Sequence, residues 1–292
     1  MPQPTDLVLG PVRLRPAELA VMAIVNRTPD SFDDRGANLD LADARDAVRR
    51  AVDEGAVIVD IGGVRAGSVG ARVDEDEELA RVLPVVEFAR SAYPDVAISV
   101  DTWRSGVARA AAAAGADLVN DTWQGADQDV VAVAADTGLG LVCSHTGGLP
   151  PRTDPHQVDY DDVVADVVAT VTAAAESAVA AGVRADGILV DPTHDFGKTT
   201  YDSLELTSRL DELVAAGWPV LVALSRKDFV GETLGLPASE RLEGTLAATA
   251  VSAWLGARVF RAHDVQATRR VLDMVASIIG SRPPTAARRG LG

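Results

Sequence analysis

The sequence alternates eight times between a short apolar run and a longer, Ala-rich stretch with helical periodicity. Short apolar runs of this kind are typical of strands that are buried on both faces of a parallel sheet. We expect strands at Val21–Asn26, Val57–Ile61, Ala97–Asp101, Leu118–Asn120, Gly140–Cys143, Ile188–Asp191, Val220–Leu224 and Arg258–Arg261. We expect helices to begin near Leu41, Asp74, Ser105, Asp129, Tyr160, Tyr201, Ser239 and Asp264. Eight such units in about 260 residues predict a single (β/α)8 TIM barrel.

A doubly wound sheet is the alternative fold. The count of eight units and the lack of a G-x-G-x-x-G segment after the first strand favour the barrel. No linker is long enough to divide the chain, so we expect one domain over residues 1–292. Within it, residues 1–18 form an N-terminal extension, and residues 281–292, rich in Pro and Arg, form a flexible C-terminal tail. Gly55, Gly115 and Gly256 are expected to end helices in the left-handed conformation.

Composition narrows the classes of function. The net charge of −16 argues against a nucleic-acid partner. The single cysteine, Cys143, rules out an internal disulfide and fits a reducing compartment. We find no apolar run of about 18 residues that would span a membrane, and no signal-peptide pattern at the start. The sequence therefore predicts a cytoplasmic protein without a nucleic-acid or membrane partner.

Polar residues follow the predicted strands. In a barrel of this type, ligands bind at the carboxyl ends of the strands. One such residue would mean little, because Asp and Asn favour turns in any case, and Arg226 and Lys227 are equally compatible with a solvated loop. The whole set predicts a polar site on one face of the barrel. Its members are Asn26, Asp60, Asp101, Asn120, His145, Asp191, Lys227, Arg261 and His263.

Two kinds of chemistry are represented in this set. One group is suited to the edge of a flat heterocycle, because a carboxylate readily accepts hydrogen bonds from a guanidine-like edge; it comprises Asp101, Asn120, Asp191 and Lys227. The other group is suited to a phosphate or a metal-bound diphosphate. It comprises Arg261, His263 and Asn26.

Seven ordered motifs resemble those of the dihydropteroate synthase family, over roughly Val21 to Ile279. They are NRTPDSF at 26–32, VDIGG at 59–63, SVDT at 99–102, VND at 119–121, DPTHDFGK at 191–198, SRK at 225–227 and RAHD at 261–264. The resemblance implies a single pterin-binding domain. In this family, p-aminobenzoate displaces diphosphate from a dihydropterin diphosphate, and a C–N bond forms.

The resemblance also implies roles for individual residues. The pterin would be bound by Asp101, Asn120, Asp191 and Lys227. The diphosphate would be bound by Asn26, Arg261 and His263, with Mg²⁺ near Asn26. Lys227, Arg261 and His263 would then be the catalytic residues, since the chemistry is mainly stabilisation of a departing anion. A homodimer is implied as well, through the segments Leu246–Leu255 and Val265–Ile279.

The chain departs from the family pattern mainly where the arylamine would bind. After Ile61-Gly62-Gly63, the family's Glu-Ser-Thr-Arg-Pro-Gly is replaced by residues 64–70, VRAGSVG. Asp228 replaces a small hydroxyl residue that lies near the carboxylate of p-aminobenzoate in the family. If Asp228 points inward, two like charges about 4 Å apart repel by about 4 kcal/mol. Alternatively, Asp228 is a solvated acid that pairs with Lys227 or Arg226.

Other departures affect the first loop and the segment DPTHDFGK. Two family glycines are replaced by Thr193 and Asp195, with His194 between them. Arg27 replaces an apolar residue after Asn26. Asp33 follows PDSF, and Thr146 stands where the family tends to have Met.

We therefore expect a divergent homologue that binds a dihydropterin diphosphate but condenses it weakly, or not at all, with p-aminobenzoate. An active dihydropteroate synthase of folate biosynthesis with an unusual second loop is one alternative. A non-catalytic binding or scaffold protein is another.

Overall fold

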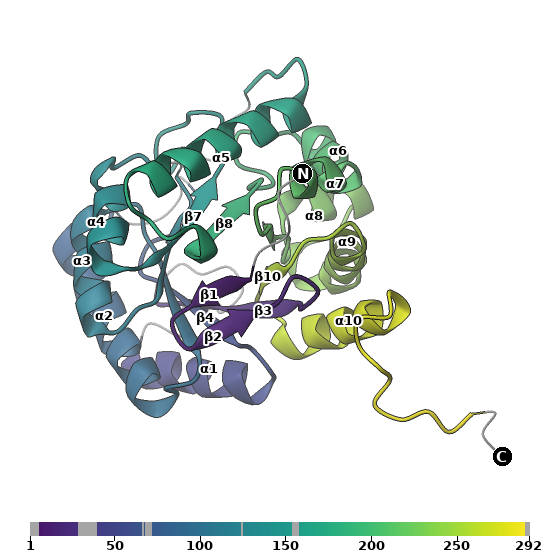
Figure 1. The fold of residues 1–292 in the computed structure, drawn as a ribbon, viewed down its shortest axis with the longest axis horizontal. Helices are drawn as coiled ribbons and strands as arrows, with labels where there is room; N and C mark the ends of the chain where they lie inside the picture. Colours follow the sequence, from purple (N-terminus) through teal and green to yellow (C-terminus); the bar gives the residue numbers. More distant parts are fainter. Residues whose placement is uncertain are drawn as a thin grey trace.

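The structure, a computed structural model, describes residues 6–28, 40–65, 67, 72–123, 125–153 and 158–289, and forms a (β/α)8 barrel (Figure 1). Its parallel strands pair in the order β8-β7-β6-β5-β4-β3-β10-β9. An isolated parallel bridge between Val190 and Val220 brings the two ends of this sheet together. The strands are β3 (Ala20–Asn26), β4 (Ile58–Gly62), β5 (Ala97–Asp101), β6 (Leu118–Asp121), β7 (Gly140–Ser144), β8 (Ile188–Asp191), β9 (Leu221–Ala223) and β10 (Val259–Ala262). The predicted fold class is confirmed.

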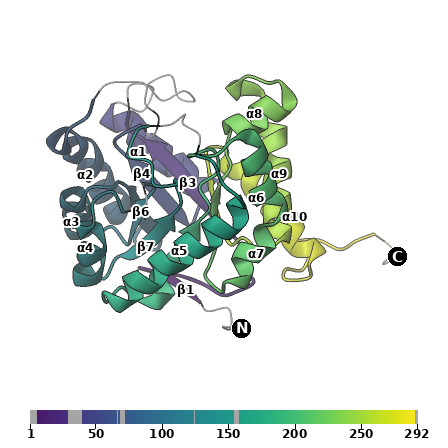
Figure 2. The same ribbon diagram turned by 90° about the horizontal axis from the view of Figure 1, so that it is seen from above.

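A short antiparallel pair, β1 (Leu7–Leu9) and β2 (Val12–Leu14), closes the amino-terminal mouth of the barrel. Leu7, Leu9 and Leu14 are buried and pack against the first residues of the barrel strands. Their alternation with more exposed residues is the period of a half-buried strand. This segment was predicted only as an N-terminal extension, without strands. Figure 2 shows β1 at one end of the barrel and α8 at the other.

Helices surround the sheet and bury their apolar faces against it. They are α1 (Leu41–Asp53), α2 (Glu75–Ala92), α3 (Ser105–Ala114), α4 (Asp129–Thr137), α5 (Val163–Ala180), α6 (Thr200–Ser208), α7 (Leu210–Ala215), α8 (Asp228–Leu234), α9 (Leu242–Trp254) and α10 (Val265–Ile278). The Asp40 and Asp74 side chains cap α1 and α2. Gly55, Gly115 and Gly256 adopt φ angles of 99°, 106° and 107°, as predicted for helix ends.

Some helix boundaries differ from the predicted ones. Helix α5 begins at Val163 rather than near Tyr160, because the Asp162 side chain accepts hydrogen bonds from the first turn. Helix α9 begins at Leu242, because residues 238–240 form a separate 3-10 turn. Helices α7 and α8 were not predicted. Helix α8 is important for the site, because it starts immediately after Lys227.

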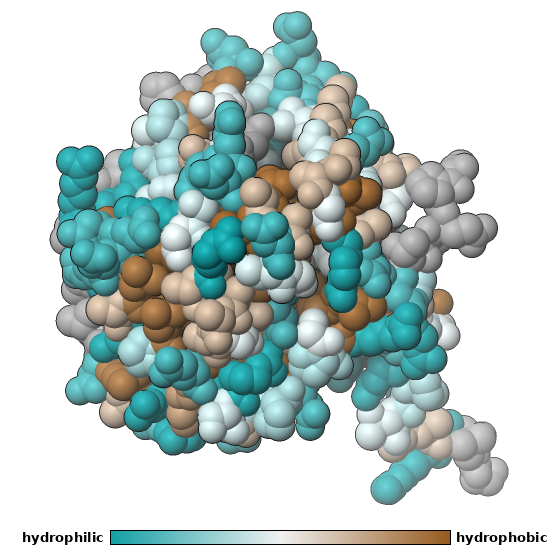
Figure 3. Space-filling view, turned by 60° about the vertical axis from the view of Figure 1, so that its left-hand side comes forward, coloured by the Kyte–Doolittle hydropathy of each residue, from teal (hydrophilic) through white to brown (hydrophobic). Residues whose placement is uncertain are grey.

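Helix α5 is long and apolar enough, by length and composition alone, to cross a membrane. Its apolar face, including Val167 and Val171, is instead packed into the largest core cluster. One face of the molecule shows hydrophilic side chains interspersed with smaller apolar areas (Figure 3). After α10, the chain projects away from the barrel (Figure 1), and residues 283–289 are exposed.

Candidate functional site

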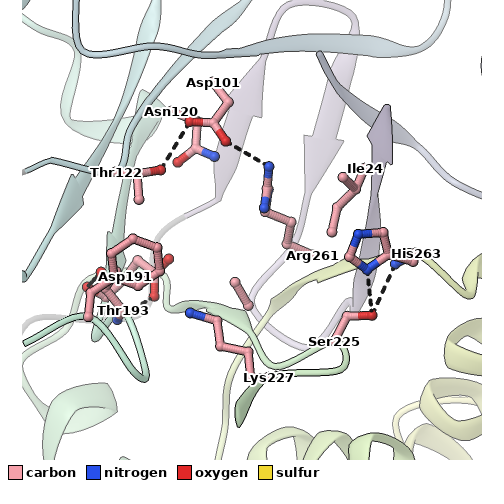
Figure 4. Close-up of a pocket in the computed structure, with 12 residues that line it drawn as sticks. Ile24, Asp101, Asn120, Thr122, Asp191, Thr193, Ser225, Lys227, Arg261 and His263 are labelled. Carbon is pink, nitrogen blue, oxygen red and sulfur yellow. Dashed lines mark hydrogen bonds and ion pairs between the residues drawn. The ribbon is translucent and has the colours of Figure 1, made fainter. Parts of the chain in front are cut away.

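A pocket of about 170 Å³ lies at the carboxyl ends of the barrel strands. Figure 4 shows Lys227 and Arg261 reaching into a space that Asp101, Asn120 and Asp191 also face. The full lining is Ile24, Asp101, Asn120, Thr122, Asp191, Thr193, Phe196, Ala223, Ser225, Lys227, Arg261 and His263. The predicted pterin-binding residues are therefore gathered at one mouth, together with two of the three predicted diphosphate-binding residues.

The floor of the pocket is a network of buried charges and amides. Arg261 donates from Nε to Asp60 Oδ2 at 2.6 Å and from Nη2 to Asp101 Oδ2 at 2.8 Å. Asp60 is completely buried and also accepts hydrogen bonds from Ser99 Oγ and Asn120 Nδ2, at 2.6 and 3.2 Å. Since every group here has a partner on a strand, the floor is held rigidly by the sheet itself.

Burial controls the ionisation of this floor. It raises the pKa of Asp101 to about 7; the Arg261 guanidinium opposes this shift and the Asp60 carboxylate adds to it. Burial also raises the pKa of Asp191, against the attraction of Lys227 and other cations. For Arg261, burial lowers the pKa, but the two carboxylates outweigh it and raise the pKa overall. The charge of the Asp101 carboxyl therefore changes near neutral pH.

Loop 191–198 holds the wall of the pocket opposite Arg261. The Thr193 amide donates to Asp191 Oδ1 at 2.7 Å and so orients this carboxylate. Lys227 Nζ donates to the His194 carbonyl and lies 4.4 Å from the centre of the Phe196 ring. This loop therefore determines where both Asp191 and Lys227 point.

Lys198 holds the backbone of the same loop in place. Its buried Nζ donates to the carbonyls of His145, Thr193 and Phe196 at 2.8, 3.1 and 2.9 Å. Burial lowers the pKa of Lys198 to about 7, and the charge of Lys227 adds to this shift. Lys198 was not among the predicted site residues. A signal existed, because lysine occurs only at positions 198 and 227 of the 292 residues.

The two residues that replace family glycines keep a left-handed backbone. Thr193 and Asp195 have φ angles of 52° and 72°. Such angles cost a residue with a Cβ of the order of 1–3 kcal/mol. Thr193 recovers part of this through its hydroxyl, which donates to the Asp191 carbonyl at 3.0 Å and accepts from the His145 amide at 3.1 Å. Both residues therefore carry side chains in a backbone conformation that glycine adopts without strain.

The Asp195 carboxylate occupies the turn that follows Lys227. It accepts from the amide of Asp228 at 2.7 Å and from the amide of Phe229 at 3.3 Å. Ser203 Oγ donates to it at 3.3 Å. Burial raises the pKa of Asp195, while Lys227 opposes this shift.

Asp228 itself does not line the pocket. Its side chain is 73% exposed and accepts from Arg241 Nη1 at 2.7 Å. Of the two interpretations of Asp228, the structure supports the solvated acid. It forms an ion pair with Arg241 rather than with Arg226, which bonds Asp264 at 2.9 Å. The inward-pointing reading is not what the structure shows.

Two other strand-end residues take different positions. His263 lines the pocket, and its amide donates to Ser225 Oγ at 3.2 Å. His145 was expected on the same face, and this was wrong. It is buried, with Nε2 2.7 Å from Asp166 Oδ1 on α5, and burial lowers its pKa to about 4. His145 therefore joins the barrel to its helix layer.

Asn26 ends β3 but is not among the residues that line the pocket. Its Oδ1 lies 2.8 Å from where a side-chain carbon on Gly62 would be, so a larger residue at position 62 would displace the Asn26 side chain. Among the residues that the structure describes, no group of three His, Cys, Asp or Glu side chains is placed to hold a metal. Asn26 thus offers a single oxygen, which fits Mg²⁺ only if phosphate and water supply the other ligands.

Arg27 anchors the start of the first loop to α2. Pro84 lies within α2 and has no N–H to donate to the carbonyl of Ala80. Arg27 Nη1 donates to the carbonyls of Ala80 and Arg81, at 3.1 Å in both cases.

Asp33 and most of the altered second loop, residues 66 and 68–70, lie outside the described residues.

Comparisons with known proteins agree with this geometry. A family described as "Pterin binding enzyme" matches residues 22–263. The chain is 62% identical over 275 residues to "Inactive dihydropteroate synthase 2" of Mycobacterium leprae, with 93% of this chain and 94% of that protein covered. It is 38% identical to the dihydropteroate synthase of Bacillus subtilis, with 89% and 88% covered.

A solved structure shows the same likeness in three dimensions. The dihydropteroate synthase of Yersinia pestis, determined as a sulfonamide drug complex, superposes with a TM-score of 0.89 at 34% identity. The match covers 95% of this chain and all of that one.

Proposed function

The chain belongs to the pterin-binding enzyme family, and on that premise we propose that it is a dihydropteroate synthase homologue that binds a dihydropterin diphosphate. In this proposal the pocket at the carboxyl mouth is the ligand site, and condensation with p-aminobenzoate is weak or absent. The observation that carries the proposal is the convergence of Asp101, Asn120, Asp191 and Lys227 in one pocket.

The pterin is the better match for the floor. Its ring edge offers several N–H donors side by side, and the Asp101 and Asp191 carboxylates are acceptors that bind such donors strongly. The Asn120 amide can both donate and accept. Lys227 adds a donor for a ring acceptor on the opposite wall, where the Phe196 ring and the His194 carbonyl position it.

The diphosphate is assigned to Arg261, His263 and Asn26. Arg261 is fixed by two carboxylates, so its free edge is oriented before a ligand arrives, as electrostatic stabilisation of an anion requires. His263 lies on the same side of the pocket. Mg²⁺, held by Asn26 and the diphosphate oxygens, would supply further charge for the leaving group when bound.

Within this scheme the protein acts mainly by positioning. As the bond between the pterin methylene carbon and the diphosphate oxygen breaks, positive charge grows on carbon and negative charge on the leaving group. Arg261 and His263 stabilise the departing anion. Lys227 and the floor acids hold the ring in place, so that an amine nitrogen could attack the carbon.

The proposal of weak or absent condensation rests on the other side of the site. The second loop has lost the Thr, Arg and Pro of the family pattern. The relative from Mycobacterium leprae carries the word "Inactive" in its name. An active enzyme is the alternative, since the residues assigned to the pterin and diphosphate are of the family's types.

Two measurements test the proposal. Calorimetry with dihydropterin diphosphate and Mg²⁺ should give a saturable signal, and Asp101→Ala should abolish it. A diphosphate-release assay with p-aminobenzoate should give turnover at least about a hundredfold below that of an ordinary family enzyme. No binding would contradict the pterin site, and normal turnover would favour the active alternative. A scaffold role would be favoured if binding were absent and Asp101→Ala and Lys227→Ala left cellular phenotypes unchanged.

We also propose a cytoplasmic homodimer. Helices α9 and α10 pack side by side and expose apolar side chains, with Trp254 and Met274 each 61% exposed and Ile278 58% exposed. Apolar side chains of this size gathered on neighbouring helices favour burial against a second copy. Light scattering should give twice the monomer mass, and Trp254→Glu should halve it.

A further inference from the structure

Asp195 has a backbone conformation that is unfavourable for a residue with a side chain. Its φ angle of 72° is one that glycine adopts without strain. The carboxylate is nevertheless held firmly, because Ser203 Oγ bonds both the Asp195 carboxylate and the Asp195 amide, at 3.3 and 3.1 Å. A strained residue that its neighbours hold in place has a candidate functional role.

This carboxylate uses the backbone donors beside the pocket. Lys227 lines the pocket, and the amides of the next two residues, Asp228 and Phe229, both donate to Asp195. Two consecutive amides of this kind are the usual donors for an anionic group. In this protein, the Asp195 carboxylate already accepts hydrogen bonds from both amides.

The cations around the same turn are also matched by acids. Lys227 is attracted to the Asp195 carboxylate. Arg226 forms an ion pair with Asp264, and Arg241 forms one with Asp228. A further carboxylate arriving at this turn would meet Asp195 and would find its donors in use.

We infer that Asp195 is a specificity-determining residue that excludes carboxylated amines from the Lys227 side of the pocket. The amine that the site accepts is therefore an uncharged arylamine. This inference rests on the proposed function and on the family resemblance, which implies that the carboxylate of p-aminobenzoate lies near residue 228. Asp228, the more obvious acid in the sequence, has no such role because it is exposed and paired with Arg241.

The test compares two amines that differ only in charge. The protein is first saturated with 6-hydroxymethylpterin, Mg²⁺ and inorganic diphosphate, which cannot condense with an amine. Calorimetry then measures binding of p-aminobenzoate and of its neutral isostere 4-aminobenzamide. For the unaltered protein we expect 4-aminobenzamide to bind about tenfold more tightly, because it avoids the repulsion of a nearby like charge.

Two variants distinguish the effect of the Asp195 charge from the effect of its hydrogen bonds to the two amides. Asp195→Asn removes the charge but keeps an oxygen that can accept from the two amides. Asp195→Gly also frees those amides and relieves the backbone, so this variant should fold. Affinity for p-aminobenzoate should rise about threefold in the first variant and about tenfold or more in the second. Affinity for 4-aminobenzamide should change less than about twofold.

Asp228→Asn is the matched control, because it removes an equal charge one residue beyond Lys227. It should change p-aminobenzoate affinity less than about twofold, as expected for an exposed acid. Equal p-aminobenzoate affinity in Asp195→Gly and the unaltered protein would overturn the inference, and so would an equal gain in Asp228→Asn. If 6-hydroxymethylpterin does not bind the unaltered protein, the proposed function fails and this inference fails with it.

Discussion

The floor of the pocket and its Lys227 wall are built by different means. The floor consists of side chains at the ends of sheet strands, with Arg261 bonded to both Asp60 and Asp101. The wall consists of two loops, and it depends on left-handed backbone at Thr193 and Asp195. A strand fixes the direction of a side chain through its neighbours in the sheet, whereas a loop must fix it through individual bonds.

This difference indicates where the protein can change. An altered floor residue would leave a buried charge without a partner, so the floor has little freedom. An altered wall residue needs only to keep the course of the backbone, as Thr193 and Asp195 do. The departures from the family pattern affect the wall and the loops and leave the floor residues of the family's type.

The largest effect should follow Arg261→Ala, which would show how far the floor tolerates change. Asp60 and Asp101 would be left without their cation, so the free energy of unfolding should fall by about 3 kcal/mol. Pterin affinity should fall at least about a hundredfold, since the floor would no longer be fixed. Denaturant unfolding and calorimetry measure the two quantities. Arg261→Lys keeps the positive charge but loses the planar guanidinium with its two donors. Its stability and pterin affinity should therefore lie between those of the unaltered protein and of Arg261→Ala. Unchanged stability in Arg261→Ala would refute the rigid floor.

Pterin affinity should depend on pH through Asp101. Its pKa is raised to about 7, so the ionised fraction falls as the pH falls below 7. Because the ionised form is the acceptor, affinity should drop by up to about tenfold per pH unit below 7 and level off above it. Calorimetry between pH 5.5 and 8, values chosen to bracket that pKa, tests this. Asp101→Asn should flatten the profile, and a flat profile in the unaltered protein would count against the assignment.

Lys227→Met should weaken pterin binding about tenfold without lowering the melting temperature, because Lys227 serves the ligand more than the fold. NMR of protein containing ¹⁵N-labelled lysine observes the two lysines separately, since the chain has lysine only at 198 and 227. Addition of 6-hydroxymethylpterin should move the Lys227 signal and leave that of Lys198 nearly in place. Movement of the Lys198 signal alone would contradict the arrangement of the wall.

The smallest effect should come from Thr193→Gly. Relief of the left-handed backbone gains about 1 kcal/mol, and loss of the hydroxyl's two hydrogen bonds costs a similar amount. Thr193→Ala loses the bonds and keeps the strain, so it should destabilise the protein by about 1–2 kcal/mol. Denaturant unfolding compares the two variants. Equal stability of both would mean that the backbone angle contributes little to the wall.

The sequence predicted the floor well because it follows strand periodicity. Met22 and Ile24 alternate along β3, and Leu118 and Asn120 along β6, so that inward positions recur every second residue. The same rule would have corrected the error at His145. It shares the parity of Leu141 and Cys143, which face the helices rather than the barrel axis.

The wall was harder to predict, because its contacts join residues far apart in the chain. The bond from the Asp228 amide to Asp195 spans 33 residues and has no local pattern. The sequence marked both acids as unusual, but it could not show that Asp195 bonds the amides after Lys227 while Asp228 is exposed. Helix α8 was missed for a related reason, since seven residues are too few for a clear helical period. The roles of the site residues stay predictions until ligands are measured.

The strand pair β1–β2 has a practical consequence for such measurements. It seals the mouth opposite the pocket, so the amino-terminal end of the described chain leaves the barrel on the side away from the ligands. A purification or capture tag placed before residue 6 would tether the protein to a sensor surface with its pocket facing the solution. Coupling through amines would do the opposite for any molecule attached at Lys227, because the linkage would then run through the ligand site.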